Sequence, residues 1–88
     1  MALWVRTMLM TGPREEVEAT AALHREHLRE LRDRGKLRVA GEMGDREGFL
    51  EVFEAADRKE AEAIARSSPL VEEGLGAWML RPWKDAEL

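Results

Sequence analysis

The sequence contains no cysteine, asparagine or glutamine, and its longest apolar runs are only a few residues long. Without cysteine there is no disulfide bond, no thiolate metal site and no cysteine nucleophile. Runs this short argue against a membrane-spanning helix, which needs about 20 apolar residues, and against the apolar stretch of a signal peptide. For residues 1–88 we therefore expect a single domain in a cytoplasmic protein.

The charged side chains give a net charge of -4 and a pI near 5.2. Phosphate binding relies on clustered Lys and Arg, so this balance argues against a nucleic-acid partner. The Arg-rich segment 25–34 is interleaved with Glu and Asp, which is typical of a solvated helix face with ion pairs. Arg outnumbers Lys and heat-labile Asn and Gln are absent, a bias typical of thermophilic proteins that a GC-rich genome would produce in part.

Hydrophobic periodicity predicts four strands and two helices. Pro13 suits the first turn of a helix, and Gly35 suits the left-handed position after its end. Asp57 begins a second helix as the acceptor of a capping box, and Pro69 ends it. The predicted elements are a strand at 2–10, a helix at about 14–34, strands at 37–43 and 48–55 joined by a turn at 44–47, a helix from about 57 to 67, a loop or short turn at 70–76, a strand at 77–83 and a frayed tail at 84–88.

The order β-α-β-β-α-β predicts an α+β, ferredoxin-like fold with a four-stranded antiparallel sheet and two helices on one face. The other face of the sheet would be open to water. Both sides of the strands nevertheless carry apolar groups, since Trp4 and Val5 have opposite parity on the first strand, as do Val52 and Phe53 on the third. We therefore predict a homodimer formed through the open sheet face.

A histidine interrupts the apolar stripe of the first predicted helix. Because its neighbours in the stripe recur at spacings of three and four, His24 faces the sheet. It is either a core histidine that is hydrogen-bonded to its surroundings or a functional group. The stripe consists of Val17, Ala21, His24, Leu28 and Leu31.

The other chemistry-bearing residues form no recognisable catalytic or cofactor motif. His27 lies at the margin of the helix face, and no third ligand follows the two histidines, so we expect neither metal nor cofactor. Ser67 and Ser68 are explained as helix terminators and not as nucleophiles. The glycines at 41–48 fit a hairpin turn and not a phosphate loop. The methionines are core residues or the lining of a pocket for a flat apolar molecule.

Three stretches of the sequence resemble the YciI-like (YCII-related) proteins. The first is His24 to Gly41, and the second is Ser68 to Gly74, which resembles the family's Asp-Pro-aromatic segment and its following glycine. The third, Arg81 to Trp83, resembles the family's basic-proline-aromatic ending. The positions in ungapped register in the first stretch are Leu28, Leu31, Gly35, Leu37 and Ala40.

The resemblance implies a dimeric α/β barrel of ferredoxin-like protomers, with an active-site histidine and aspartate that face a cleft. His24 occupies the histidine position, whereas Ser68 stands at the aspartate position and Ala21 stands where an arginine often lies. A serine can hydrogen-bond to His24 but cannot supply the charge that makes an imidazole more basic. Glu42, which replaces a proline common in the family, is a candidate to bring a carboxylate near the cleft.

Two functions remain open. The first is a small cofactor-free lyase or isomerase that acts on an oxygenated ring or enol, with His24 as acid-base in a pocket between helix and sheet. The second is a non-catalytic dimeric module that binds a small organic ligand, which a serine at position 68 permits. A cofactor-independent oxygenase or haem-degrading enzyme of the same superfamily ranks third, because such haem sites often use an asparagine and the chain has none.

Overall fold

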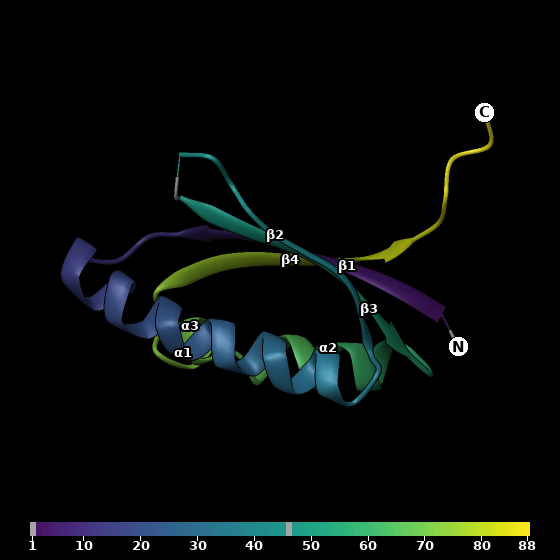
Figure 1. The fold of residues 1–88 in the computed structure, drawn as a ribbon, viewed down its shortest axis with the longest axis horizontal. Coiled ribbons are helices and arrows are strands. Elements are labelled where there is room, and N and C mark those ends of the chain that lie inside the picture. The colour runs from purple at the N-terminus through teal and green to yellow at the C-terminus, as the bar shows by residue number, and fades with distance from the viewer. Residues whose placement is uncertain (1, 46) are drawn as a thin grey trace.

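Figure 1 shows the computed structural model, which describes residues 2–45 and 47–88. The turn predicted at 44–47 includes Arg46, which lies outside the described residues. Within them, four strands and three helices are present. The elements are β1 (Ala2–Met10), α1 (Arg14–Asp33), β2 (Leu37–Glu42), β3 (Gly48–Ala55), α2 (Arg58–Arg66), α3 (Pro69–Glu72) and β4 (Gly76–Trp83).

The four strands form one antiparallel sheet in the order β2-β3-β1-β4. Strands β1 and β3 are central, and Arg6 of β1 lies directly opposite Glu51 of β3. All three helices lie on the same face of the sheet (Figure 1). The structure therefore confirms the predicted α+β, ferredoxin-like fold, with α3 as an additional helical turn.

The apolar core lies between the helices and the sheet. Phe53 and Ala55 of β3, Ala61 of α2 and Leu70 of α3 are all fully buried there. Removal of this apolar surface from water is the main force that holds the helices on the sheet. The stripe predicted on α1 is confirmed, since its buried residues are Val17, Ala21, His24, Leu28 and Leu31.

The ends of the elements differ slightly from the prediction. Helix α1 ends at Asp33, and Gly35 has a φ of +72°, as expected of the left-handed residue after a helix. Strand β2 ends at Glu42 instead of Met43, and β4 begins one residue early, at Gly76. These shifts of one residue leave the number and order of the strands as predicted.

The segment predicted as a loop or short turn contains α3. Pro69 occupies the first helical turn, where its missing N–H has no intrahelical partner to lose. The side chain of Ser68 caps the turn by accepting a hydrogen bond from the backbone N–H of Leu70 at 3.2 Å. Gly74 then leaves it with a φ of +69°. Ser68 thus begins α3 directly after Ser67, which ends α2.

The face of the sheet opposite the helices is uncovered and apolar (Figure 1). Leu9, Val39 and Met79 each leave 54 % of their surface exposed, and Met43 leaves 42 %. The apolar character that the sequence predicts for both faces is therefore confirmed. Residues 84–88 form no helix or strand, and they run away from the body of the domain on this side (Figure 1).

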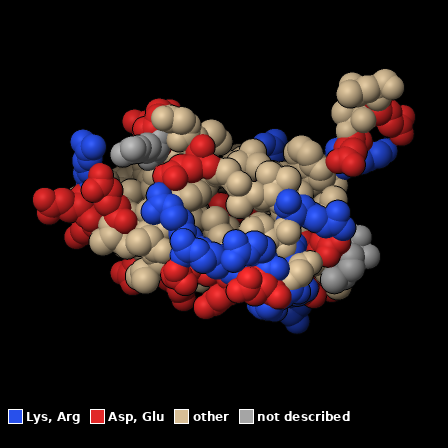
Figure 2. Space-filling model, viewed as in Figure 1, with Lys and Arg blue, Asp and Glu red and all other residues tan. Residues whose placement is uncertain are grey.

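The surface charges are interleaved. Figure 2 shows basic and acidic side chains next to one another over the helical side of the molecule. Ion pairs account for several of them, such as Arg14 with Glu18 at 3.2 Å and Arg25 with Glu42 at 3.0 Å. Among the residues that the structure describes, no helix has the length and hydropathy needed to cross a membrane.

A buried histidine network as candidate functional site

His24 lies in the middle of α1 with no exposed surface, and the protein binds both of its ring nitrogens. Its Nδ1 lies 2.7 Å from the Oγ of Ser68, and its Nε2 lies 3.0 Å from the Oε2 of Glu51. The ring also packs edge to face with that of Phe49, with the two centroids 4.5 Å apart. The imidazole is therefore held in one orientation from three sides.

The carboxylate beside His24 belongs to a buried ion pair between two neighbouring strands. Arg6 Nε donates to Glu51 Oε1 at 2.6 Å, and neither side chain has exposed surface. A second nitrogen of Arg6, Nη1, donates to the backbone oxygen of Ala65 at 2.7 Å. Ala65 is in the last turn of α2, where unpaired helical carbonyls favour a cation. Arg6 thus ties β1 to both β3 and α2.

The charge state of Glu51 follows from these partners. Burial by itself would raise its pKa, but the hydrogen bond from His24 and the positive charge of Arg6 outweigh burial and hold the pKa below the ordinary 4.5. Glu51 is therefore ionised at neutral pH. An ionised carboxylate only accepts hydrogen bonds, so Nε2 of His24 carries the hydrogen and a neutral ring has its lone pair at Nδ1.

Ser68 completes the network with a hydroxyl group that both accepts and donates a hydrogen bond. Its oxygen accepts from the N–H of Leu70, and its hydrogen is then free to donate to the lone pair at Nδ1 of His24. This arrangement satisfies every polar atom of Ser68 and His24. The four side chains form a chain of hydrogen bonds in the order Arg6, Glu51, His24 and Ser68.

The position of this network is unusual for so small a domain. All four side chains have 0 % relative exposure and lie between the helices and the sheet. A buried ion pair stabilises a fold less than well-packed apolar residues of the same volume, because both charges lose their hydration. Perturbed and buried titratable groups of this kind concentrate at functional sites. The network is therefore the strongest candidate for a site of chemistry.

His27 lies next to the network, one turn further along α1. Its ring centroid is 5.7 Å from that of His24, and its side chain is only partly buried, as predicted for the margin of the helix face. Burial and the nearby charge of Arg6 lower the pKa of His27 from 6.5 to about 4. His27 is therefore neutral at pH 7.

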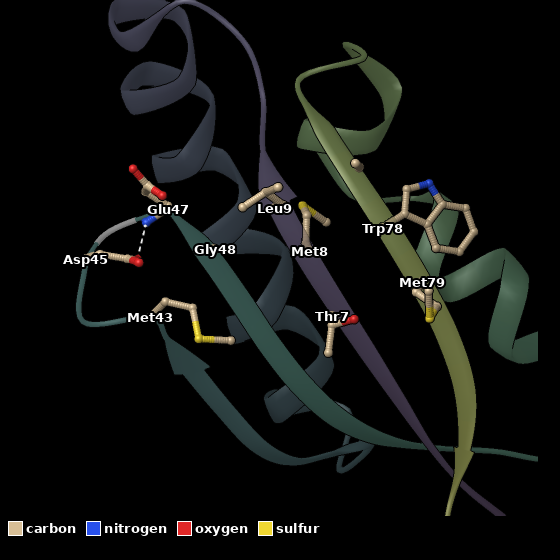
Figure 3. A pocket seen from close by; sticks show the side chains of 10 residues that line it. Thr7, Met8, Leu9, Met43, Asp45, Glu47, Gly48, Trp78 and Met79 are labelled. Carbon is tan, nitrogen blue, oxygen red and sulfur yellow. Dashed lines mark hydrogen bonds between the residues drawn. The ribbon is translucent and has the colours of Figure 1, made fainter.

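An apolar hollow of about 370 Å³ opens on the other side of the sheet, by the turn between β2 and β3. Figure 3 shows the side chains of Thr7, Leu9, Met43 and Met79 around it. None of the four network residues lines this hollow, although its size suits a single ring. The residues that line it are Thr7, Met8, Leu9, Met43, Asp45, Glu47, Gly48, Ala77, Trp78 and Met79.

Comparison with known proteins gives a family and a fold. The sequence profile of the YCII-related domain matches residues 3–84. The chain belongs to the YCII-related family. Its structure is similar to that of 5-chloro-2-hydroxyhydroquinone dehydrochlorinase from Burkholderia phenoliruptrix AC1100 in complex with 2,5-dihydroxybenzoquinone, with a TM-score of 0.79 and 21% sequence identity over 96% of this chain and 95% of that chain. At this identity the similarity shows the shared fold. No curated protein matches the sequence significantly.

In this YCII-related protein, the structure brings together the two site residues that the sequence predicts, His24 and Ser68. The carboxylate near His24 is not Glu42, however, because Glu42 reaches outward to the guanidinium of Arg25. Glu51 lies there instead. Among the described residues, no group of three or more His, Asp or Glu side chains is arranged to hold a metal ion.

Sequence reasoning missed Arg6 and Glu51, although the strand pattern contains a signal for both. Inward-facing positions of β1 read Trp4, Arg6 and Met8. Those of β3 read Phe49, Glu51 and Phe53. A charged residue in the middle of each buried stripe has to be paired, because an isolated buried charge is very costly. The antiparallel register then places the two opposite each other.

Proposed function

We propose that this protein is a small cofactor-free lyase or isomerase in which His24 transfers a proton. The observation that carries the proposal is the position of His24 between a hydroxyl group and a buried ion pair. Glu51 holds Nε2–H and orients the ring, and it stabilises the positive charge that the ring acquires when Nδ1 takes up a proton. The role that the family resemblance implies for an aspartate thus passes to a glutamate on the opposite side of the ring.

The proton reaches His24 through Ser68. When the Oγ of Ser68 takes a proton from the substrate, its own hydrogen moves to Nδ1 of His24, 2.7 Å away, so that one proton is transferred in all. The reverse movement returns a proton to the substrate or to its leaving group. Because Ser68 is fully buried, contact with substrate requires movement of α3, which is a single turn of four residues.

The substrate class that we propose is an oxygenated ring or enol. The similar dehydrochlorinase acts on a chlorinated hydroxyhydroquinone and was solved with a dihydroxybenzoquinone. Loss of HCl removes a proton and a chloride ion from such a ring, and shift of a double bond within it removes a proton at one atom and returns one at another. One histidine with a fixed tautomer is sufficient for either reaction.

The active assembly that we propose is a homodimer joined through the open sheet face. Leu9, Val39 and Met79 of that face are more than half exposed in the single chain. An exposed apolar surface over a whole sheet face is rare in monomers and is buried when a second sheet packs on it. In the dimer, the hollow beside Met79 would be covered by the partner.

A dimeric module that binds a small molecule without catalysis is the second candidate. One observation favours it. The network has no exposed atom, and the protein itself occupies both nitrogens of His24, as in a core histidine whose role is structural. In that case the hollow on the other side of the sheet, with its methionines and Trp78, would be the ligand site.

Turnover measurements distinguish the two candidates. The wild type is tested with chlorinated hydroxyhydroquinones and with enol lactones, beside His24→Gln, Ser68→Ala and the control Arg29→Ala on the exposed side of α1. We expect His24→Gln to reduce kcat by about 100-fold or more, since general acid-base catalysis typically contributes 10²–10⁴. Ser68→Ala should reduce kcat in the same way, and Arg29→Ala should have the kcat of the wild type. Turnover that survives in His24→Gln would reject the mechanism, and binding without turnover would favour the module.

A further inference from the structure

Arg6 uses only part of its hydrogen-bonding capacity. A guanidinium group has five N–H donors, of which Nε serves Glu51 and Nη1 serves the carbonyl oxygen of Ala65. The third nitrogen, Nη2, is buried and has no hydrogen-bond partner among the described residues. A buried donor on a charged group that lacks a partner is costly, so this nitrogen marks a place where an acceptor belongs.

A second buried nitrogen without a partner belongs to the histidine one turn further along α1. Nε2 of His27 also has no hydrogen-bond partner among the described residues. The ring of His27 lies 5.7 Å from that of His24, and burial and then the charge of Arg6 lower the pKa of His27. A neutral imidazole can donate a hydrogen bond to a developing negative charge without a proton of its own being lost. Arg6 and His27 thus offer two donors beside the proposed proton-transfer group.

We propose that Arg6 Nη2 and His27 Nε2 form a subsite for an anionic oxygen, such as the enolate or phenolate oxygen of a hydroxylated ring. The inference rests on the proposed function, because it names the feature of the substrate that this site recognises. Glu51 occupies the Nε edge of Arg6, and Nη2 remains available to donate a hydrogen bond to an acceptor.

The subsite would serve the proposed chemistry directly. Removal of a proton from carbon next to a carbonyl group leaves negative charge on the carbonyl oxygen, and donors fixed in advance at that oxygen lower the barrier. His24 moves the proton while Arg6 and His27 hold the charge. A substrate that already carries an ionised enol group would be held in the same way before reaction.

Binding of two quinones that differ in one property tests the subsite. The probe is 2,5-dihydroxybenzoquinone, whose enolic hydroxyl groups ionise, and the comparison is 2,5-dimethoxybenzoquinone, which cannot form an anion. Calorimetry should give a Kd for the dihydroxy compound at least tenfold lower, since hydrogen bonds to a charged oxygen are stronger than those to a neutral one. Equal affinity for the two quinones, or no binding of the dihydroxy compound at millimolar concentration, would overturn the proposal.

Variants of His27 locate the binding. His27→Phe keeps a ring of similar size without a donor, whereas His27→Gln keeps an N–H at similar reach. We expect Phe to weaken binding of the dihydroxy compound about tenfold and Gln to stay within about threefold of the wild type. Unchanged affinity in His27→Phe would also overturn the subsite. The double variant Arg6→Met/Glu51→Gln removes both charges together and should abolish the preference for the anion.

These outcomes are separate from those of the proposed function. Selective binding of the anion without any turnover would support the subsite and count against the enzyme. Turnover that depends on His24, together with equal affinity for both quinones, would overturn the subsite and leave the enzyme standing.

Discussion

Each face of the sheet carries residues that a small monomer would rarely place there. The face under the helices, shielded from water, holds Arg6 and Glu51 among its apolar residues, and His24 of α1 packs against them. The face toward water is lined with leucine, valine and methionine and carries the apolar hollow (Figure 3). An ion pair thus lies where water is excluded, and several large apolar side chains lie where water is admitted.

The difference between the two faces has two separate explanations, one for each face. A buried ion pair stabilises the fold less than apolar residues of the same volume would. The presence of Arg6 and Glu51 on the covered face is therefore best explained by a role in function. Apolar side chains are unfavourable in contact with water, so their presence on the open face is best explained by association with a second chain. The proposed site thus lies on one face and the proposed dimer interface on the other, and each proposal can be tested by substitution.

The largest effect is expected from a change on the covered face. Glu51→Leu leaves the guanidinium group of Arg6 buried without its countercharge, and we expect the free energy of unfolding to fall by about 3–5 kcal/mol. The double variant Arg6→Met/Glu51→Leu removes both charges and should come within about 2 kcal/mol of the wild type. Urea denaturation measures all three proteins.

A matched control lies on the same strand. Glu54 pairs with Arg38 on the open side of β3, where Arg38 is largely exposed, and Glu54→Leu should change the stability by less than about 1 kcal/mol. If the double variant of the covered face were as unstable as Glu51→Leu, the buried charge would not be the cause of the loss.

The next effect concerns association through the open face. Met79→Lys and Val39→Lys each place a charge in the proposed dimer interface, and we expect about a 100-fold weaker dimer, because a buried unpaired charge costs several kcal/mol. Leu23→Lys is the control, since Leu23 is 57 % exposed on α1 and away from that face. Light scattering coupled to gel filtration measures the mass, and a wild type of 10.0 kDa at micromolar concentration would contradict the homodimer.

The smallest effect is a dependence of stability on pH at the edge of the network. The pKa of His27 is about 4 in the folded protein and near 6.5 when unfolded, so between these values the unfolded chain binds the proton and the folded chain does not. Stability from neutral His27 is therefore present above pH 6.5 and is lost as the pH falls toward 4. The loss should be about 1 kcal/mol, because a half-buried ring is partly solvated.

Comparison of the wild type with His27→Gln isolates this contribution. Glu51 also loses stabilisation in acid, because its pKa is lowered by folding, but that loss is common to both proteins. Urea denaturation at pH 7 and pH 4 should therefore show the wild type losing more stability than His27→Gln. If the free energies of unfolding of the wild type and His27→Gln differed by the same amount at pH 7 and pH 4, the lowered pKa of His27 would be contradicted.

Much of the fold could be predicted from local patterns. Pro13 and Gly35 mark the limits of α1, and the spacing of its apolar residues places His24 on the buried face. The one helix that escaped prediction, α3, is too short for periodicity to identify. Its signal was the pair Ser68-Pro69, a cap followed by a proline at the first helical position.

Only two of the four residues of the candidate site were predicted from the sequence, and there is a physical reason for this. His24 and Ser68 could be predicted from the sequence because helix periodicity and family motifs concern residues near each other along the chain. Arg6 and Glu51 are 45 positions apart and meet only through strand register. The sequence by itself determined that a histidine faces the core; the tertiary structure decided which charges meet it, because pairing across a sheet depends on contacts between distant segments.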